Sequence, residues 1–224
     1  TELRAVMKYL RNFAHLRRVL VIPVIAAGVL FLAGAGAAVD DEKVGVITTI
    51  NGSAFAMQDA APRVLAKGAG IFLGDVLSTG KGARLEIRMI DDAKFTLGER
   101  TLFVVEKYFL EQGQGNAAIR LMTGAVKVVT GKIAQLKARP FKLHTSVATI
   151  GVRGTTFWGG LLDGVHQFAL LGGHAISIEN KAGRVEITKV GVGAKVASDD
   201  TPPSTPRTWP RGKLDRAAAM TAVR

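Results

Sequence analysis

Histidines and the carboxylates near them are the first residues to test for acid–base or metal chemistry. His166 and His174 lie eight positions apart around an expected strand, and Asp163 is the only carboxylate close to them. A metal ion needs three or four ligands that converge on one point, and this set does not supply them. We therefore expect no metal site, and we expect both histidines, like His144, to lie on solvent-facing strands.

The sequence supports no other type of catalytic site. The chain has no cysteine, so disulfides, thiolate catalysis and cysteine-ligated metals are excluded. Asp91 and Asp92 form an acidic pair in an expected turn, where both would be solvated, and calcium would need more oxygen ligands than this segment offers. No serine has a base placed near it by spacing, and no phosphate-binding loop is present. We expect neither an enzyme nor a bound cofactor.

One short stretch, residues 149–157, places a single arginine among apolar residues and glycines. Gly151 and Gly154 lie on either side of Arg153. Glycines at this spacing are typical of a tight corner between strands, because glycine tolerates positive φ and close chain approach. An arginine in apolar surroundings is expected to pair with a carboxylate or with turn carbonyls. Arg153 is therefore predicted to be a structural staple; the alternative is a contact with a partner or ligand.

Two further residues have both a structural and a functional interpretation. Asp75 follows Gly74 at the start of an expected strand, where its carboxylate could accept backbone N–H groups of a turn or pair with Arg153. Trp158 precedes two glycines and is predicted to pack in the core; the alternative is an exposed contact point.

The N-terminal part of the chain has the composition of an export signal. A basic segment ending at Arg18 is followed by an apolar stretch and by small residues up to Ala37, as at a signal-peptidase site. Met7 has the position of a natural initiator, which would make residues 1–6 an upstream artefact. The 21 uncharged residues from 19 to 39 could also span a bilayer about 30 Å thick, so an uncleaved anchor is the alternative. In both cases the rest of the chain crosses the membrane.

From residue 44 onward the hydrophobic pattern changes to a period of two. Residues 84–89, 175–179 and 184–188 alternate between apolar and polar side chains, as half-buried strands do. Turn signals such as Asn51-Gly52 recur about every eight to twelve residues. Closed barrels and sandwiches give similar patterns, but the regular spacing with glycine corners favours a β-solenoid. We predict an all-β domain, a β-solenoid-like stack of short strands.

These patterns divide the chain into three parts. Residues 1–38 form the signal peptide or membrane anchor, a hydrophobic helix, and residues 44–198 form the β domain. Residues 199–224 form a proline-rich linker with a short tail helix. Because so short an isolated helix is marginal in water, we expect it to fray or to dock on the domain or a partner.

The charge balance restricts the class of partner. Thirty lysines and arginines against eighteen aspartates and glutamates give a net charge of +12. This surplus favours anionic surfaces such as lipid headgroups or acidic polysaccharide. Aromatic residues make up only 6% of the chain and provide no stacking platform, so a nucleic-acid partner is not expected.

Several motifs, in order, resemble a known family. Residues 72–80 (Phe-Leu-Gly-Asp-Val-Leu-Ser-Thr-Gly) resemble the G-D-x-L-x-T signature of FecR-type domains. Residues 83–87, 92–98, 124–126 and 143–155 resemble the later motifs of the same family, so the resemblance covers residues 44–157. It implies a β-solenoid-like periplasmic domain. In the best-known members, such a domain carries a signal from an outer-membrane TonB-dependent receptor to a cytoplasmic sigma factor.

The resemblance leads to an expected function. It does not include the anti-sigma region or the C-terminal signalling subdomain of those sigma-factor regulators. We expect an exported, non-enzymatic FecR-domain protein, periplasmic or secreted, that binds an envelope protein or an anionic polymer. The alternative is an inner-membrane-anchored signal transducer with its β domain in the periplasm. A glycan-active enzyme would need paired carboxylates on one strand face, which the sequence does not place. The candidate structural or partner-binding residues are Gly74, Asp75, Thr79, Arg153, Gly154, Thr155 and Trp158.

Overall fold

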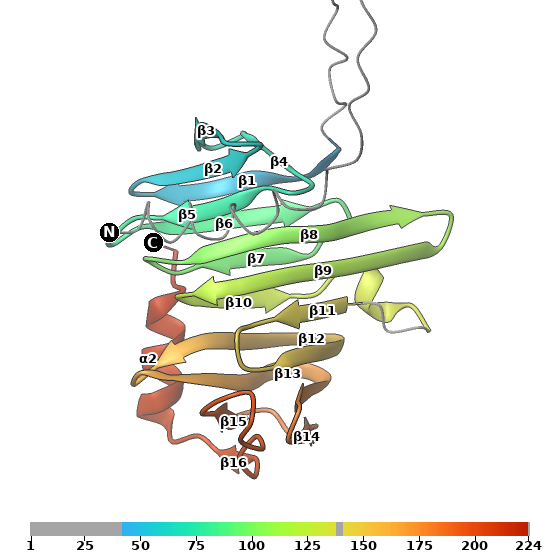
Figure 1. Ribbon diagram of the computed structural model, residues 1–224, viewed down its shortest axis with the longest axis vertical. Coiled ribbons are helices and arrows are strands. Elements are labelled where there is room, and N and C mark those ends of the chain that lie inside the picture. The colour runs from blue at the N-terminus through green and yellow to red at the C-terminus, as the bar shows by residue number, and fades with distance from the viewer. Residues whose placement is uncertain (1–41, 138–140, 224) are drawn as a thin grey trace, which may run out of the picture. The chain divides into compact units, whose positions relative to one another are not determined.

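The computed structural model describes residues 42–137 and 141–223, and most of them are in β-strands (Figure 1). The first eight strands are β1 (Lys43–Asn51), β2 (Ala54–Gln58), β3 (Ala61–Val64), β4 (Gly70–Phe72), β5 (Val76–Thr79), β6 (Arg84–Met89), β7 (Lys94–Leu97) and β8 (Leu102–Glu111). The others are β9 (Gln114–Thr123), β10 (Ala125–Val129), β11 (Phe141–His144), β12 (Thr149–Leu162), β13 (Val165–Asn180), β14 (Gly183–Ile187), β15 (Val192–Val196) and β16 (Arg207–Thr208). A 3₁₀ turn, η2 (Ile133–Gln135), precedes β11, and a helix, α2 (Arg211–Met220), ends the described chain.

The predicted all-β class is confirmed, whereas the solenoid is not. The strands form one hydrogen-bonded sheet in the order β3-β2-β5-β8-β9-β11-β12-β10-β7-β6-β1-β4, extended by β13 to β16. Coils stacked in a β-solenoid pair their strands in parallel. Among the strand pairs of the described residues, only β9 and β11 are parallel. The predicted signal peptide or anchor lies outside the described residues. Within the described ranges, no helix is long and apolar enough to cross a membrane.

The sheet is folded on itself at β12. One half contains β3, β2, β5, β8, β9 and β11, and it faces the other half, which contains β10, β7, β6, β1 and β4, across an apolar core. The period-two pattern explains why: in β6, Leu85 and Ile87 point inward and are fully buried. The centre of the core is Phe95 of β7, whose ring contacts three aromatic rings of β8 and β11. The ring centroids lie 5.7 Å from Phe103, 6.2 Å from Tyr108 and 6.1 Å from Phe141.

The two halves of the sheet meet along β12. Its first residues pair with β11, and residues 156–160 pair with β10 on the same edge, while β13 follows β12 along the other edge. Between these two parts the chain bends at Gly154, which has φ +49°; the next residue, Thr155, pairs with Gly173 of β13, which has φ +85°. The prediction of a tight corner between two strands is therefore wrong in one respect, because the chain bends inside one long strand, β12.

The C-terminal segment packs against the β domain. Asn180 donates hydrogen bonds to the carbonyl oxygens of Ser198 (3.0 Å) and Thr201 (2.7 Å), and the backbone N–H of Ser204 donates to the carbonyl of Lys195. Helix α2 crosses the strands at one side of the sheet (Figure 1). It covers an apolar cluster that contains Ala125, Trp158, Leu162, Ala169, Trp209 and Ala217. The short helix is thus stabilised by packing rather than by its own propensity.

Replacing Phe95 with alanine tests the packing between the two halves of the sheet. Removing a fully buried ring leaves a cavity lined by three other rings, so we expect Phe95→Ala to lower the free energy of unfolding by about 3–5 kcal/mol. Urea unfolding followed by tryptophan fluorescence measures this loss. The control is Phe55→Ala in β2, whose side chain is 45% exposed, where we expect a loss below about 1 kcal/mol. Equal losses for the two variants would contradict the packing described here.

Candidate functional site

Two hollows in the surface meet at Arg153 and form the candidate site. We call the first the sheet hollow; it lies over β11 to β14, has a volume of about 650 Å³, and includes Lys142, His144, Gly151, Ser177 and Glu186 in its lining. We call the second the bend hollow; it lies beside the bend of β12 and has a volume of about 740 Å³. The bend hollow is lined by Val129, Thr130, Ala134, Gln135, Leu136, Lys137, Arg153, Gly154, Thr155, Thr156, Gly173 and His174. Arg153 lines both.

Arg153 is not the predicted structural staple. Its side chain is exposed, and it makes no hydrogen bond or ion pair with the residues that the structure describes. The physical reason is the alternation of β12: Val152 points into the core, so Arg153 points outward to solvent. The proposed contact of Arg153 with a partner or ligand remains a prediction.

The staple is instead Arg63, which the sequence analysis missed. Its guanidinium nitrogen Nη2 donates to both carboxylate oxygens of Asp75, at 2.7 and 2.6 Å, and Nη1 donates to the carbonyl of Gly70. The side chain of Asp75 is fully buried and also accepts the backbone N–H of Phe72 at 2.8 Å. Arg63 therefore links β3 to β4, the two strands at the ends of the folded sheet. The turn role predicted for Asp75 is confirmed, and its predicted pairing with Arg153 is wrong.

Gly74 and Thr79, two more candidates from the FecR-like motif, help to form turns. Gly74 has φ +87°, a backbone conformation that favours glycine. Thr79 is fully buried; its hydroxyl donates to the carbonyl of Gly98 at 2.6 Å and accepts the backbone N–H of Thr101 at 2.9 Å. These contacts give both residues a structural role.

Thr155 and Gly154 stabilise the bend beside Arg153. The backbone N–H of Thr155 donates to the hydroxyl of Thr130 at 2.8 Å, and the hydroxyl of Thr155 donates to the carbonyl of Gly172. A Cβ atom added to Gly173 would lie 2.4 Å from the carbonyl oxygen of Gly154, so strands β12 and β13 approach each other here as closely as glycine allows. The bend thus holds the backbone that carries Arg153.

Trp158 packs in the core, as its structural interpretation predicted. It is fully buried, and its ring lies 6.1 Å from that of Trp209 in an edge arrangement. Its indole nitrogen is buried without a hydrogen-bond partner among the described residues.

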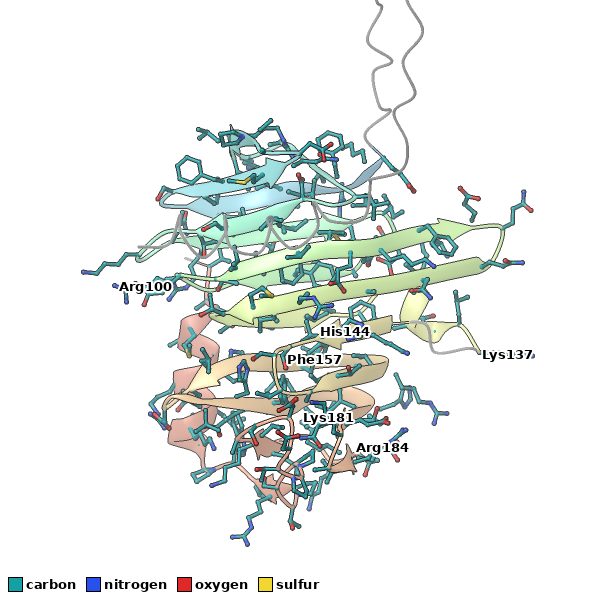
Figure 2. The ribbon with its side chains drawn as sticks, viewed as in Figure 1. Arg100, Lys137, His144, Phe157, Lys181 and Arg184 are labelled. Atoms are coloured by element: carbon teal, nitrogen blue, oxygen red, sulfur yellow. The ribbon has the colours of Figure 1, made fainter. Side chains whose placement is uncertain are left out.

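The three histidines of the described residues have different surroundings; His144, at the end of β11, is labelled in Figure 2. His174 is exposed, as predicted, but His166 is buried, 8% exposed, and its Nε2 lies 3.3 Å from the hydroxyl of Ser146. Its other ring nitrogen has no partner within the described part of the chain, so no carboxylate orients it as a hydrolytic triad requires. His144 is half-buried, with Nδ1 3.1 Å from the hydroxyl of Thr149. No metal-binding group of side chains exists among the described residues.

The expectation that Asp91 and Asp92 are both solvated is wrong for Asp91 and correct for Asp92. Asp91 is fully buried and accepts the hydroxyl of Tyr108 at 2.5 Å and the backbone N–H of Ile133 at 3.1 Å. Burial, and then the neighbouring carboxylate, raise the pKa of Tyr108 far above its usual value, so this hydroxyl stays protonated. Asp92 is exposed and pairs with Lys132 at 2.7 Å. Asp91 is therefore a second buried carboxylate with a structural role.

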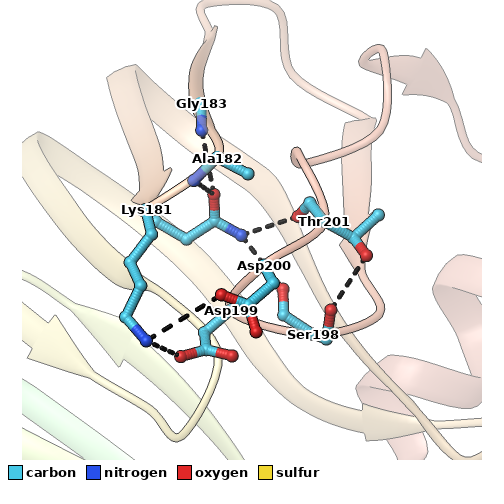
Figure 3. A network of polar contacts seen from close by, with 8 residues as sticks. Lys181, Ala182, Gly183, Ser198, Asp199, Asp200 and Thr201 are labelled. Atoms are coloured by element: carbon cyan, nitrogen blue, oxygen red, sulfur yellow. Dashed lines mark hydrogen bonds and ion pairs between the residues drawn. The ribbon is translucent and has the colours of Figure 1, made fainter.

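The sheet hollow is lined by charges that are mostly paired. Lys181 pairs with Asp199 at 2.6 Å, within the network that attaches residues 198–201 to the turn after β13 (Figure 3). Arg184 contacts Glu179 at 3.4 Å. The lining contains four lysines and arginines and three acidic residues. In contrast, the lining of the bend hollow contains no acidic residue.

The two arginines give opposite predictions for stability. Arg63→Ala leaves a buried carboxylate without its charged partner, so we expect a loss of about 3 kcal/mol in the free energy of unfolding. Arg153→Ala removes an exposed, unpaired side chain, and we expect a change within about 0.5 kcal/mol. Urea unfolding of the two variants measures both values. A large loss for Arg153→Ala with little loss for Arg63→Ala would contradict the assignment of the staple.

The stability of the protein should depend on pH through His166. Burial lowers the pKa of His166 from its ordinary 6.5, because the charged imidazolium loses hydration. The folded protein then binds fewer protons than the unfolded chain below about pH 6.5, so stability falls as the pH drops from 7.5 toward the lowered pKa. Burial also lowers the pKa of His144, which adds to this fall.

Urea unfolding at pH 7.5 and 5.5 measures the loss. His166→Gln should reduce it, and His174→Gln, at an exposed position, should leave it unchanged. A loss that is the same in His166→Gln as in the unmodified chain would show that His166 is not its source.

Comparisons with known proteins identify the family. Two crystal structures of a protein described as a candidate anti-sigma factor from Parabacteroides distasonis each superpose with a TM-score of 0.50, at 13% and 12% sequence identity. Each match covers 62% of this chain and 61% of the other, so the chain spans less than two thirds of those proteins, and at this identity the likeness shows the fold alone. No curated protein matches the chain. The profile of the family described as FecR protein matches residues 75–186, half of the 224 residues, from the carboxylate bound by Arg63 to Glu186 in the lining of the sheet hollow. The chain therefore belongs to the FecR protein family.

Proposed function

We propose that this protein is a non-enzymatic regulator of the FecR type, whose exported β domain acts by binding another protein of the cell envelope. The observation that carries the proposal is the family match, which includes Arg153, the whole lining of the bend hollow and all of the sheet hollow except Asp199. The fold shared with a protein described as an anti-sigma factor supports a regulatory role rather than a catalytic one.

The candidate site supports binding rather than catalysis. A catalytic site needs a nucleophile or an acid–base pair with a third group that orients it. Two hydroxyl–histidine pairs lie within the described residues, Ser146 with His166 and Thr149 with His144, and in neither pair is the histidine hydrogen-bonded to a carboxylate that would orient it. Arg153 is instead exposed on a strand that packing holds in place, which suits a contact with a preformed partner surface.

The apolar stretch of residues 19–39 favours a second candidate role, that of an inner-membrane-anchored signal transducer. Cleavage near Ala37 would release a periplasmic or secreted regulator, whereas retention would keep the β domain at the membrane. Acidic polysaccharide or a lipid surface is the alternative class of partner, since the net charge is +12.

Deleting the gene in the native host tests the regulatory role. We expect a defined set of transcripts to change, because a FecR-type regulator controls expression, and we expect the full-length gene supplied on a plasmid to restore them. RNA sequencing measures the change. Cell fractionation of the complemented strain distinguishes the released form from the anchored form. An unchanged transcriptome under conditions in which the protein is present would contradict the proposed function.

A further inference from the structure

The basic side chains that line the bend hollow have no carboxylate partner among the described residues. Lys137, Arg153 and His174 are exposed and make no hydrogen bond or ion pair with any residue in the described ranges. Six other basic residues contact a carboxylate: Arg63, Arg120, Lys132, Lys181, Arg184 and Arg216. Because the lining of the bend hollow contains no acidic residue, an anionic group of a ligand would supply the counter-charge for these cations.

The backbone beside these cations is open to close approach. Gly154 and Gly173 line the bend hollow without side chains, and the hydroxyl-bearing Thr130 and Thr156 lie in the same lining. A Cβ atom built on Gly154 would lie 3.4 Å from the ring of His174, so the histidine borders the bend directly. The hollow thus combines positive charge, backbone without side chains and hydroxyl groups on a bend that hydrogen bonds hold in place.

The charges of the sheet hollow decide which kind of anion fits. Arg153 lines both hollows. A ligand that binds Arg153 in the bend hollow and is longer than a single amino-acid side chain can therefore extend into the sheet hollow. That second hollow contains Glu179, Glu186 and Asp199, and Glu186 has no partner among the described residues. A polyanion charged along its whole length, such as a sulfated polysaccharide, would place a negative charge against the unpaired carboxylate of Glu186, whereas a peptide that is acidic at one end only would not. Neither lining contains a tryptophan, tyrosine or phenylalanine on which a sugar could stack.

We propose that the bend hollow binds the carboxylates of an acidic peptide segment in a partner protein, with Arg153 and Lys137 as the main ion-pairing residues and the following residues of the peptide in the sheet hollow. This inference rests on the proposed function and names the chemistry of the partner. The guanidinium of Arg153 suits a carboxylate because it donates two parallel N–H groups.

A labelled peptide tests this site directly. The probe is a fluorescein-labelled decapeptide with three glutamates at one end followed by serine and glycine, added to the full chain in neutral detergent. Fluorescence anisotropy should show binding, and the same peptide with glutamines in place of glutamates should bind at least about tenfold more weakly. Arg153→Glu should weaken binding of the glutamate peptide at least about tenfold, and Lys137→Glu should weaken it less.

The matched control is Lys67→Glu, which makes the same charge change at an exposed position before β4, at the far end of the sheet. Thermal unfolding of each variant shows that it is folded. Equal binding by Arg153→Glu and the unmodified chain would overturn the proposal, as would an equal loss in Lys67→Glu, which would indicate net charge alone. Binding of a sulfated oligosaccharide at this site in place of the peptide would also overturn it. Transcripts restored fully by Arg153→Glu in the deletion strain would reject this site while the regulatory role stands.

Discussion

The bend in β12 is the constraint on which the folded sheet depends. At Gly154 and Gly173 the backbone takes positive φ, and an added Cβ at Gly173 would lie 2.4 Å from the opposing carbonyl. Only glycine meets both conditions at low cost. Because β12 pairs with β11 before the bend and with β10 after it, this strand joins the two halves of the sheet. The core around Phe95 can form only when those halves face each other.

Charged side chains in this protein have two distinct roles that depend on burial. Asp75 and Asp91 are fully buried, and each accepts hydrogen bonds from a side chain and from the backbone. For Asp75 the donors are the side chain of Arg63 and the backbone N–H of Phe72; for Asp91 they include the hydroxyl of Tyr108 and the backbone N–H of Ile133. Such carboxylates fix the positions of turns and of the ends of the sheet, since an unpaired buried charge would be costly. The exposed cations near the bend contribute little to folding. They are exposed and unpaired among the described residues, which is why we propose Arg153 for binding and assign Arg63 to stability.

The sequence predicts the local features of this fold better than the contacts between distant residues. Alternation in residues 84–89 correctly predicts β6, and the position of Asp75 after Gly74 correctly predicts a turn carboxylate that accepts a backbone N–H. The partner of Asp75 could not be predicted, because Arg63 lies on an edge strand whose position depends on the folding of the whole sheet. The apolar neighbours of Arg153 suggested burial, although strand alternation places Val152 inside and Arg153 outside. The bend hollow combines residues 129–137 with 153–156 and 173–174, and no spacing in the sequence indicates that these segments meet.

The rigidity of the bend restricts how a regulator of this kind could transmit a signal. A packed core resists gradual deformation, and here the strand that carries Arg153 also joins the two halves of that core. A ligand at Arg153 would therefore meet a surface that is already formed, and its binding would leave the sheet largely unchanged. Under the proposed regulatory role, a signal is then better explained by which partner the β domain binds, and where, than by a change of shape within the domain. The geometry of the folded sheet thus favours a docking platform whose output depends on occupancy.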